Sequence, residues 1–63
     1  MADSPERLRK LRHDLSNPLS AILAETQLLL LNEDKYDAET MNGLRQIEAL
    51  SRKMRQMLQD LDG

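Results

Sequence analysis

One short segment holds the side chains best suited to chemistry. HDLSNPLSAIL runs from His13 to Leu23 and contains the chain's only histidine. A neutral imidazole is nucleophilic near pH 7, and a nearby carboxylate can orient the ring and accept its proton. Asp14 is adjacent to His13, and Asn17 follows about one helical turn later. These residue types suit proton transfer or nucleophilic chemistry at His13. With one histidine and no cysteine, no metal site is predicted.

The same segment places Pro18 five residues after the histidine, inside a longer helical pattern. An interior proline removes one backbone hydrogen bond and costs roughly 3 kcal/mol. Its missing amide would have bonded to the carbonyl of Asp14, so the hydrogen-bond ladder is open beside His13. Either Pro18 is a tolerated kink, or it bends the helix and loosens the turn that carries His13.

The elements that position these residues can be read from helix signals and apolar spacing. Asp3 or Ser4, followed by Pro5 and Glu6, is typical of a helix start. The spacing predicts a helix over residues 5–31. Its apolar stripe consists of Leu8, Leu11, Leu15, Leu19, Ile22, Thr26 and Leu29.

A second helix follows a short polar connection. Asn32 is a suitable helix stop, residues 32–37 form the connection, and Asp37 or Asp34 is available as the next cap. The second helix is predicted over residues 38–61. Its stripe contains Gly43, Ile47, Leu50, Met54, Met57 and Leu61, broadened by Met41, Leu44 and Leu58. The pattern therefore predicts an antiparallel helical hairpin.

The chain of 63 residues is too short for a two-domain enzyme or a nucleotide-binding fold. Helices of this length would be about 40 and 36 Å long, and a lone hairpin would leave much of each apolar stripe in water. Small chains without disulfides or metals need a partner for stability. We therefore predict an all-α fold in which the hairpin homodimerises into a four-helix bundle.

The periodicity also predicts where the histidine points. At about 100° per residue, the apolar stripe centres near 60° and His13 lies near 220°, on the opposite side of the helix. Ser16, Ser20 and Ala24 continue this side with small side chains, which leaves room for a partner to approach. The alternative is that His13 is an ordinary surface residue.

The segment HDLSNPL, from His13 to Leu19, resembles the H-box of sensor histidine kinases. The later segment RQIEALSRKMRQMLQDLD resembles the second helix of their dimerisation and histidine phosphotransfer domain. The resemblance implies that His13 accepts the γ-phosphoryl group of ATP and passes it to an aspartate of a response-regulator receiver domain. It also implies that Asp14 acts as a base or orienting group. Asn17 would position the nucleotide, or the water used in dephosphorylation.

The resemblance further implies that the parent protein is an enzyme of two-component signalling, a histidine protein kinase. ATP and Mg²⁺ would be held by a separate ATP-binding domain whose motifs are absent from this sequence, so the chain should not phosphorylate itself. We expect it to be a portion of a larger kinase. The alternatives are a stand-alone phosphorelay protein and a bundle that serves only for dimerisation.

An exposed apolar patch is predicted below the histidine, because Leu28 and Leu31 fall toward the face of His13 and outside the core stripe. The resemblance places a receiver domain on this side of the hairpin. The residues expected to contact it are Ser20, Ala24, Leu28 and Leu31, with Met41 or Leu44. Alternatively, the hairpin end closes around the leucines through Tyr36 or Met41.

Charge and hydropathy limit the remaining partners. The net charge is −2, and the single aromatic residue offers little for base stacking, so nucleic-acid binding is not expected. A basic cluster of Arg7, Arg9, Lys10 and Arg12 is either a solvated face or a surface that attracts an acidic receiver site or ATP phosphates. No membrane span or signal peptide is predicted, which favours a cytoplasmic segment of a parent that could itself be membrane-anchored.

Overall fold

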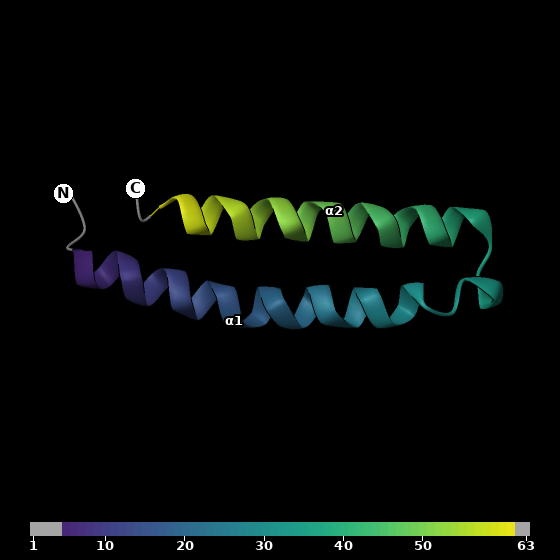
Figure 1. Cartoon of the computed structure of the whole chain (residues 1–63), viewed down its shortest axis with the longest axis horizontal. Coiled ribbons are helices and arrows are strands. Elements are labelled where there is room, and N and C mark those ends of the chain that lie inside the picture. Colours follow the sequence, from purple (N-terminus) through teal and green to yellow (C-terminus); the bar gives the residue numbers. More distant parts are fainter. Residues whose placement is uncertain (1–4, 62–63) are drawn as a thin grey trace.

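The computed structural model describes residues 5–61 and shows two long helices packed side by side in opposite directions (Figure 1). Helix α1 spans Pro5–Leu30 and helix α2 spans Ala38–Asp60, against expectations of 5–31 and 38–61. A short 3-10 helix, η1 at Glu33–Lys35, lies in the connection, which the sequence predicts as a loop over residues 32–37. The molecule measures 49 × 17 × 14 Å.

Helix α1 continues without a break through Pro18. Its N-terminal part is slightly inclined to the remainder in Figure 1, as expected where an interior proline bends a helix. The amides of Leu31 and Asn32 bond to carbonyls three residues back, at 3.2 and 3.1 Å, which tightens the C-terminal turn. The cap predicted at Asp3 or Ser4 lies outside the described residues.

Helix α2 begins with a side-chain cap. The carboxylate of Asp37 accepts a hydrogen bond from the backbone amide of Thr40 at 2.8 Å. Of the two capping residues that the sequence offers for this helix, Asp37 and Asp34, the first is therefore the cap. The connection is also joined to the second turn of α2 by an ion pair between Glu33 and Arg45, with 3.7 Å between the charged atoms.

Replacing Asp37 with alanine is expected to lower the melting temperature at pH 7, because the cap bond to Thr40 is lost. Side-chain and backbone hydrogen bonds from Thr40 lower the pKa of the Asp37 carboxyl below its ordinary value. Since the folded pKa is depressed, this stabilisation is fully present above the unfolded pKa and is lost as the pH falls through the folded value. Thermal unfolding of D37A and wild type should therefore converge in acid. The D37N variant, whose side chain can still cap the helix, is the matched control, and a D37A deficit that persisted in acid would contradict this assignment.

The two helices meet along one line of residues with heptad spacing, which we call the hairpin seam. Its buried apolar side chains are Leu19, Leu23 and Met41, and its buried polar residues are Thr26 and Ser51. The half-buried positions that complete it are Arg12, Ser16, Leu30, Leu44, Glu48, Arg55 and Leu58. The Thr26 hydroxyl donates to the carbonyl of Ile22 at 2.7 Å, so this buried hydroxyl is satisfied. The seam is apolar near the connection and more polar towards the other end.

Most of the stripe predicted as core is exposed in the single hairpin. Only Leu19 and Thr26 of the α1 stripe are buried, and Leu23, which the stripe omitted, is buried with them. The remaining apolar residues form what we call the apolar face: Leu8, Leu11, Leu15, Ile22 and Leu29 of α1, and Ile47, Leu50, Met54 and Met57 of α2 with Leu61 at its C-cap. Their exposed fractions range from 38% to 59%. One partner helix can cover only one line of residues on α1, so a second line stays open.

The extent of this exposure is large for the chain's mass. The accessible surface is 5213 Å², whereas a compact monomer of 7.3 kDa has about 4,200 Å². The radius of gyration is 15.0 Å, against about 10.6 Å for a compact domain of this length. The excess of about 1,000 Å² is of the size that one subunit buries in a stable protein interface, which is about 800 Å².

Candidate functional site

His13 lies on the outer surface of α1 and is exposed, as the periodicity predicts. At about 100° per residue it lies about 100° around α1 from the hairpin seam and about 180° from the apolar face. Its imidazole makes no hydrogen bond or ion pair with any residue in the described range 5–61. Both ring nitrogens are therefore open to an approaching group.

The carboxylate of Asp14 is directed to Lys10, not to the imidazole. The Lys10 Nζ atom lies 3.1 Å from Asp14 Oδ2, in an exposed pair one helical turn apart. Consecutive residues on a helix do not face each other, which explains why Asp14 has this partner. Exposed ion pairs of this kind contribute little, so Asp14 can exchange Lys10 for another group at small cost.

The remaining residues of the predicted site are divided between two faces. Asn17, Ser20 and Ala24 are exposed and lie on the side of His13, within about 40° of its direction. Pro18 instead lies on the apolar face, where it lines a groove between the helices. The sequence reasoning assigned Pro18 a backbone role only and missed this second one. The available signal was its spacing, because Pro18 lies three residues after Leu15 and four residues before Ile22, as a residue on the same helix face does.

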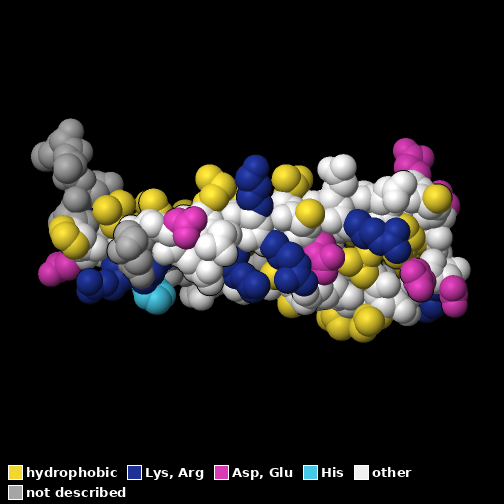
Figure 2. Space-filling model, turned by 45° about the horizontal axis from the view of Figure 1, so that its top comes forward, with side chains coloured by type: hydrophobic (Ala, Val, Ile, Leu, Met, Phe, Trp, Pro, Cys, Tyr) yellow, Lys and Arg dark blue, Asp and Glu magenta, His cyan; other side chains and the backbone are white. Residues whose placement is uncertain are grey.

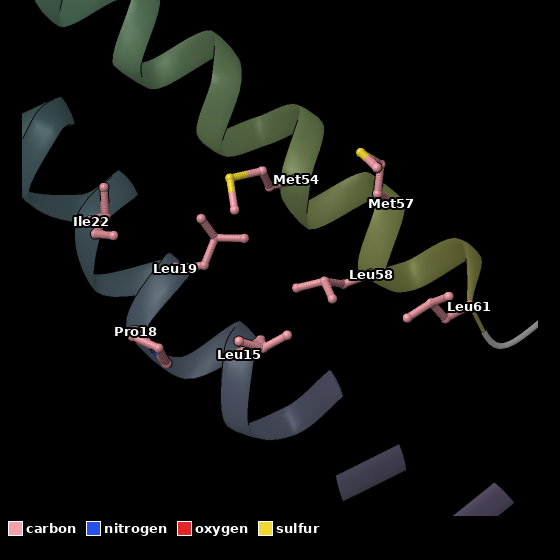
Figure 3. Close-up of a pocket in the computed structure, with 8 residues that line it drawn as sticks. All are labelled: Leu15, Pro18, Leu19, Ile22, Met54, Met57, Leu58 and Leu61. Carbon is pink, nitrogen blue, oxygen red and sulfur yellow. The ribbon is translucent and has the colours of Figure 1, made fainter. Parts of the chain in front are cut away.

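The groove has a volume of about 420 Å³ and opens on the apolar face, towards the ends of the chain. Its lining residues are Leu15, Pro18, Leu19, Ile22, Met54, Met57, Leu58 and Leu61. Figure 3 shows Leu15 and Leu19 of α1 and Met54 and Leu58 of α2 directed into the space between the two helices, with Met57 directed away from it. No nucleophile, acid or base is among these lining residues. The groove is therefore suited to apolar packing, and His13 lies on the other side of α1.

The leucines near the connection remain accessible. Leu31 is 79% exposed and Leu28 is also exposed, so closure of the hairpin end around them is wrong for this structure. Met41, in contrast, is only 6% exposed because it packs in the hairpin seam. The expectation that Met41 contacts a receiver domain is corrected accordingly. Leu44 is half-buried.

Basic side chains gather beside the histidine. Figure 2 shows Lys and Arg next to the His side chain and further along the same view of the molecule. On α2, Arg52 pairs with Glu48 at 3.4 Å, and Arg45 pairs with Glu33. Among residues 5–61, no group of three His, Cys, Asp or Glu side chains could hold a metal ion.

The family of the chain follows from a comparison with known protein families. The family described as "His Kinase A (phospho-acceptor) domain" matches residues 6–62. The chain belongs to this family: it is a phosphoacceptor and dimerisation domain of the histidine kinase type, and the family's helical hairpins dimerise. The all-α hairpin and the resemblance seen in the H-box are thereby confirmed.

No curated protein and no solved structure matches the chain significantly. Within the described part of the chain, neither helix combines the length and the apolar character needed to cross a bilayer.

Proposed function

We propose that His13 is the phosphoacceptor of this domain, receives the γ-phosphoryl group of ATP and passes it to an aspartate of a response-regulator receiver domain. One observation carries the proposal. In a chain of the phosphoacceptor family, the only histidine lies within the H-box-like segment and on the exposed side of α1. The side chains that could carry the chemistry thus lie where a nucleotide or a receiver can reach them.

The chemistry needs one nucleophilic nitrogen and one proton acceptor. The lone pair of the unprotonated ring nitrogen attacks the γ-phosphorus; the N–P bond forms, the P–O bond to ADP breaks, and ADP leaves. The other ring nitrogen then releases its proton to a base. In the second step an aspartate oxygen of the receiver attacks phosphorus, the N–P bond breaks, and His13 takes up a proton again.

Asp14 is the base or orienting group in this proposal. Its carboxylate must leave Lys10 to do so, and the exposed pair with 3.1 Å between the charged atoms is one that can be broken easily. Lys10 would then be available for the incoming phosphates. Asn17 is exposed and could contact the nucleotide, or hold the water that dephosphorylates the receiver.

ATP and Mg²⁺ would reach His13 on a separate ATP-binding domain. The described residues have no glycine-rich phosphate loop and no metal-binding cluster. The role of this chain's residues is to present the imidazole and accept its proton. The basic side chains near His13 favour the approach of phosphate groups and of an acidic receiver site.

The chain functions as a homodimer in this proposal. The apolar face covers one side of the hairpin from end to end. The surface of the whole hairpin in excess of a compact monomer is close to that buried by one subunit of a stable dimer. A second copy that covers this face completes a four-helix bundle and leaves both His13 side chains outward. The receiver then docks on the His13 side, over Ser20, Ala24, Leu28, Leu31 and Leu44.

Phosphoramidate tests the proposal without a nucleotide-binding domain. The protein is treated with this phosphoryl donor, the acid-labile adduct is located by mass spectrometry, and purified receiver domains are added. We expect a single adduct at His13 and rapid loss of phosphate to one receiver. A folded dimer whose phosphohistidine passes to no receiver would instead favour a purely structural bundle.

Leu31→Glu is expected to slow transfer to the cognate receiver at least about tenfold, because it places a charge in the apolar patch that the receiver would cover. The labelling of His13 by phosphoramidate should be unchanged. Gln46→Glu, an exposed residue on α2, adds the same charge away from the patch and serves as the control. If L31E and Q46E transfer phosphate at the wild-type rate, receiver contact at Leu31 is excluded.

A further inference from the structure

The apolar face contains one gap, at Gly43. The α2 positions 43, 47, 50, 54, 57 and 61 follow alternating spacings of four and three, and each of them except Gly43 carries a large apolar side chain. A Cβ atom placed on Gly43 would have no atom within 4 Å outside its own helical turn. The side chains of α1 in the same hairpin therefore leave this position open.

The gap lies at the level of Leu29. The start of α2 extends further towards the connection end of the molecule than the end of α1 does (Figure 1). From Ala38 to Gly43 the helix rises by about 7.5 Å, back towards the other end of the hairpin. Gly43 is thus close to the level of the last turn of α1, which contains Leu29. Leu29 is exposed and belongs to the same apolar face.

We propose that Gly43 is a hole that receives Leu29 of a second copy of this chain, and that it fixes the register of the dimer. The inference rests on the homodimer proposed above and specifies its geometry. Two copies joined face to face with both connections at the same end bring Leu29 of each next to Gly43 of the other. With the connections at opposite ends, Gly43 would face the region of Leu8 and Leu61 instead, and the level match would be lost.

The choice of residue supports a packing role. Among residues other than proline, glycine is the least favourable in a helix interior, and Gly43 lies five residues inside α2. In the isolated hairpin nothing prevents a side chain there, so alanine would be better for α2 alone. A glycine is required only if another chain occupies the space that a side chain would fill.

The dissociation constant of the dimer tests the inference, measured by sedimentation equilibrium for wild type, G43A, G43L, L29A and the double variant G43L/L29A. G43L should raise the dissociation constant at least about tenfold, because the added side chain meets Leu29 of the partner at two symmetric places. G43A should raise thermal stability at concentrations where the protein is monomeric, yet should not tighten the dimer. The double variant should bind more tightly than G43L, because the leucine introduced at position 43 then enters the space vacated at position 29.

Methionine oxidation by peroxide provides a second readout of the same interface. Met54 and Met57 are on the apolar face, whereas Met41 is buried in the hairpin seam. At a protein concentration between the dissociation constants of wild type and G43L, all three should be protected in wild type. In G43L at the same concentration, Met54 and Met57 should be oxidised while Met41 stays protected.

A dimer of G43L at least as tight as that of wild type, a tighter dimer of G43A, or the absence of rescue in the double variant overturns the proposed packing at Gly43. A wild-type protein that stays monomeric at all concentrations overturns the homodimer as well. Phosphoramidate labelling of His13 does not depend on Gly43, so failure of this inference is distinguishable from failure of the phosphoacceptor proposal.

Discussion

His13→Gln is expected to lower phosphoryl transfer to the receiver by at least about three orders of magnitude, to the level of the background. The amide of glutamine resembles imidazole in size and polarity but has no lone pair nucleophilic enough to form the N–P bond. The fold should be unaffected, because His13 is exposed and makes no polar contact with residues 5–61. Phosphoramidate labelling, transfer kinetics and thermal unfolding measure these effects together.

A relocated histidine provides the control for this prediction. Gln27 is exposed on α1, about 40° around the helix from the direction of His13. The variant H13Q/Q27H should be labelled by phosphoramidate, because any exposed imidazole can react. It should transfer phosphate to the receiver far more slowly than wild type. Equal transfer from position 27 would show that the surroundings of His13, including Asp14 and Asn17, contribute nothing.

Leu50→Glu is expected to dissociate the dimer and to raise its dissociation constant at least about a hundredfold. Two symmetric carboxylates would be moved from water into an apolar interface, at a cost of several kcal/mol unless they are protonated. Leu50 is more than half exposed in the single hairpin, so the substitution should leave each hairpin's own seam intact. Sedimentation equilibrium or light scattering over a range of concentrations measures the effect.

The adjacent residue gives a matched control for Leu50. Ala49 is equally on the surface of the single hairpin but lies about 100° further round α2, off the apolar face. Ala49→Glu introduces the same charge and should leave the dimer unchanged. If L50E dimerises as tightly as A49E, the apolar face is not the surface that a second copy covers.

The sequence was sufficient for the helical elements and for the outward position of His13. Proline favours a helix start because its backbone angle is fixed and it has no amide to satisfy, and the aspartate before α2 caps a nearby backbone amide, so these helix starts could be inferred from short segments. The outward direction of His13 follows from the 3.6-residue period alone, because the histidine is opposite the apolar stripe. The H-box-like segment is contiguous and needed no tertiary information to be noticed.

The helical period of 3.6 residues does not determine two features of the site, which depend on how individual side chains pair and pack. Asp14 could have turned towards several neighbours, and the structure directs it to Lys10 one turn away. The sequence analysis placed Met41 among the residues of the docking patch, yet its side chain is packed in the hairpin seam.

The sequence by itself determined two amphipathic helices, their ends, and a lone histidine on the outer side of the first. Only the tertiary structure decided which apolar residues close the hairpin and which remain open. The α1 pattern contains two apolar lines, one through Leu19 and Leu23 and another through Leu15 and Ile22, and either could face α2. The hydrophobic effect is non-directional, so it does not select between these two lines. Which line faces α2 is set by the crossing angle of the two helices and by the connection that joins them.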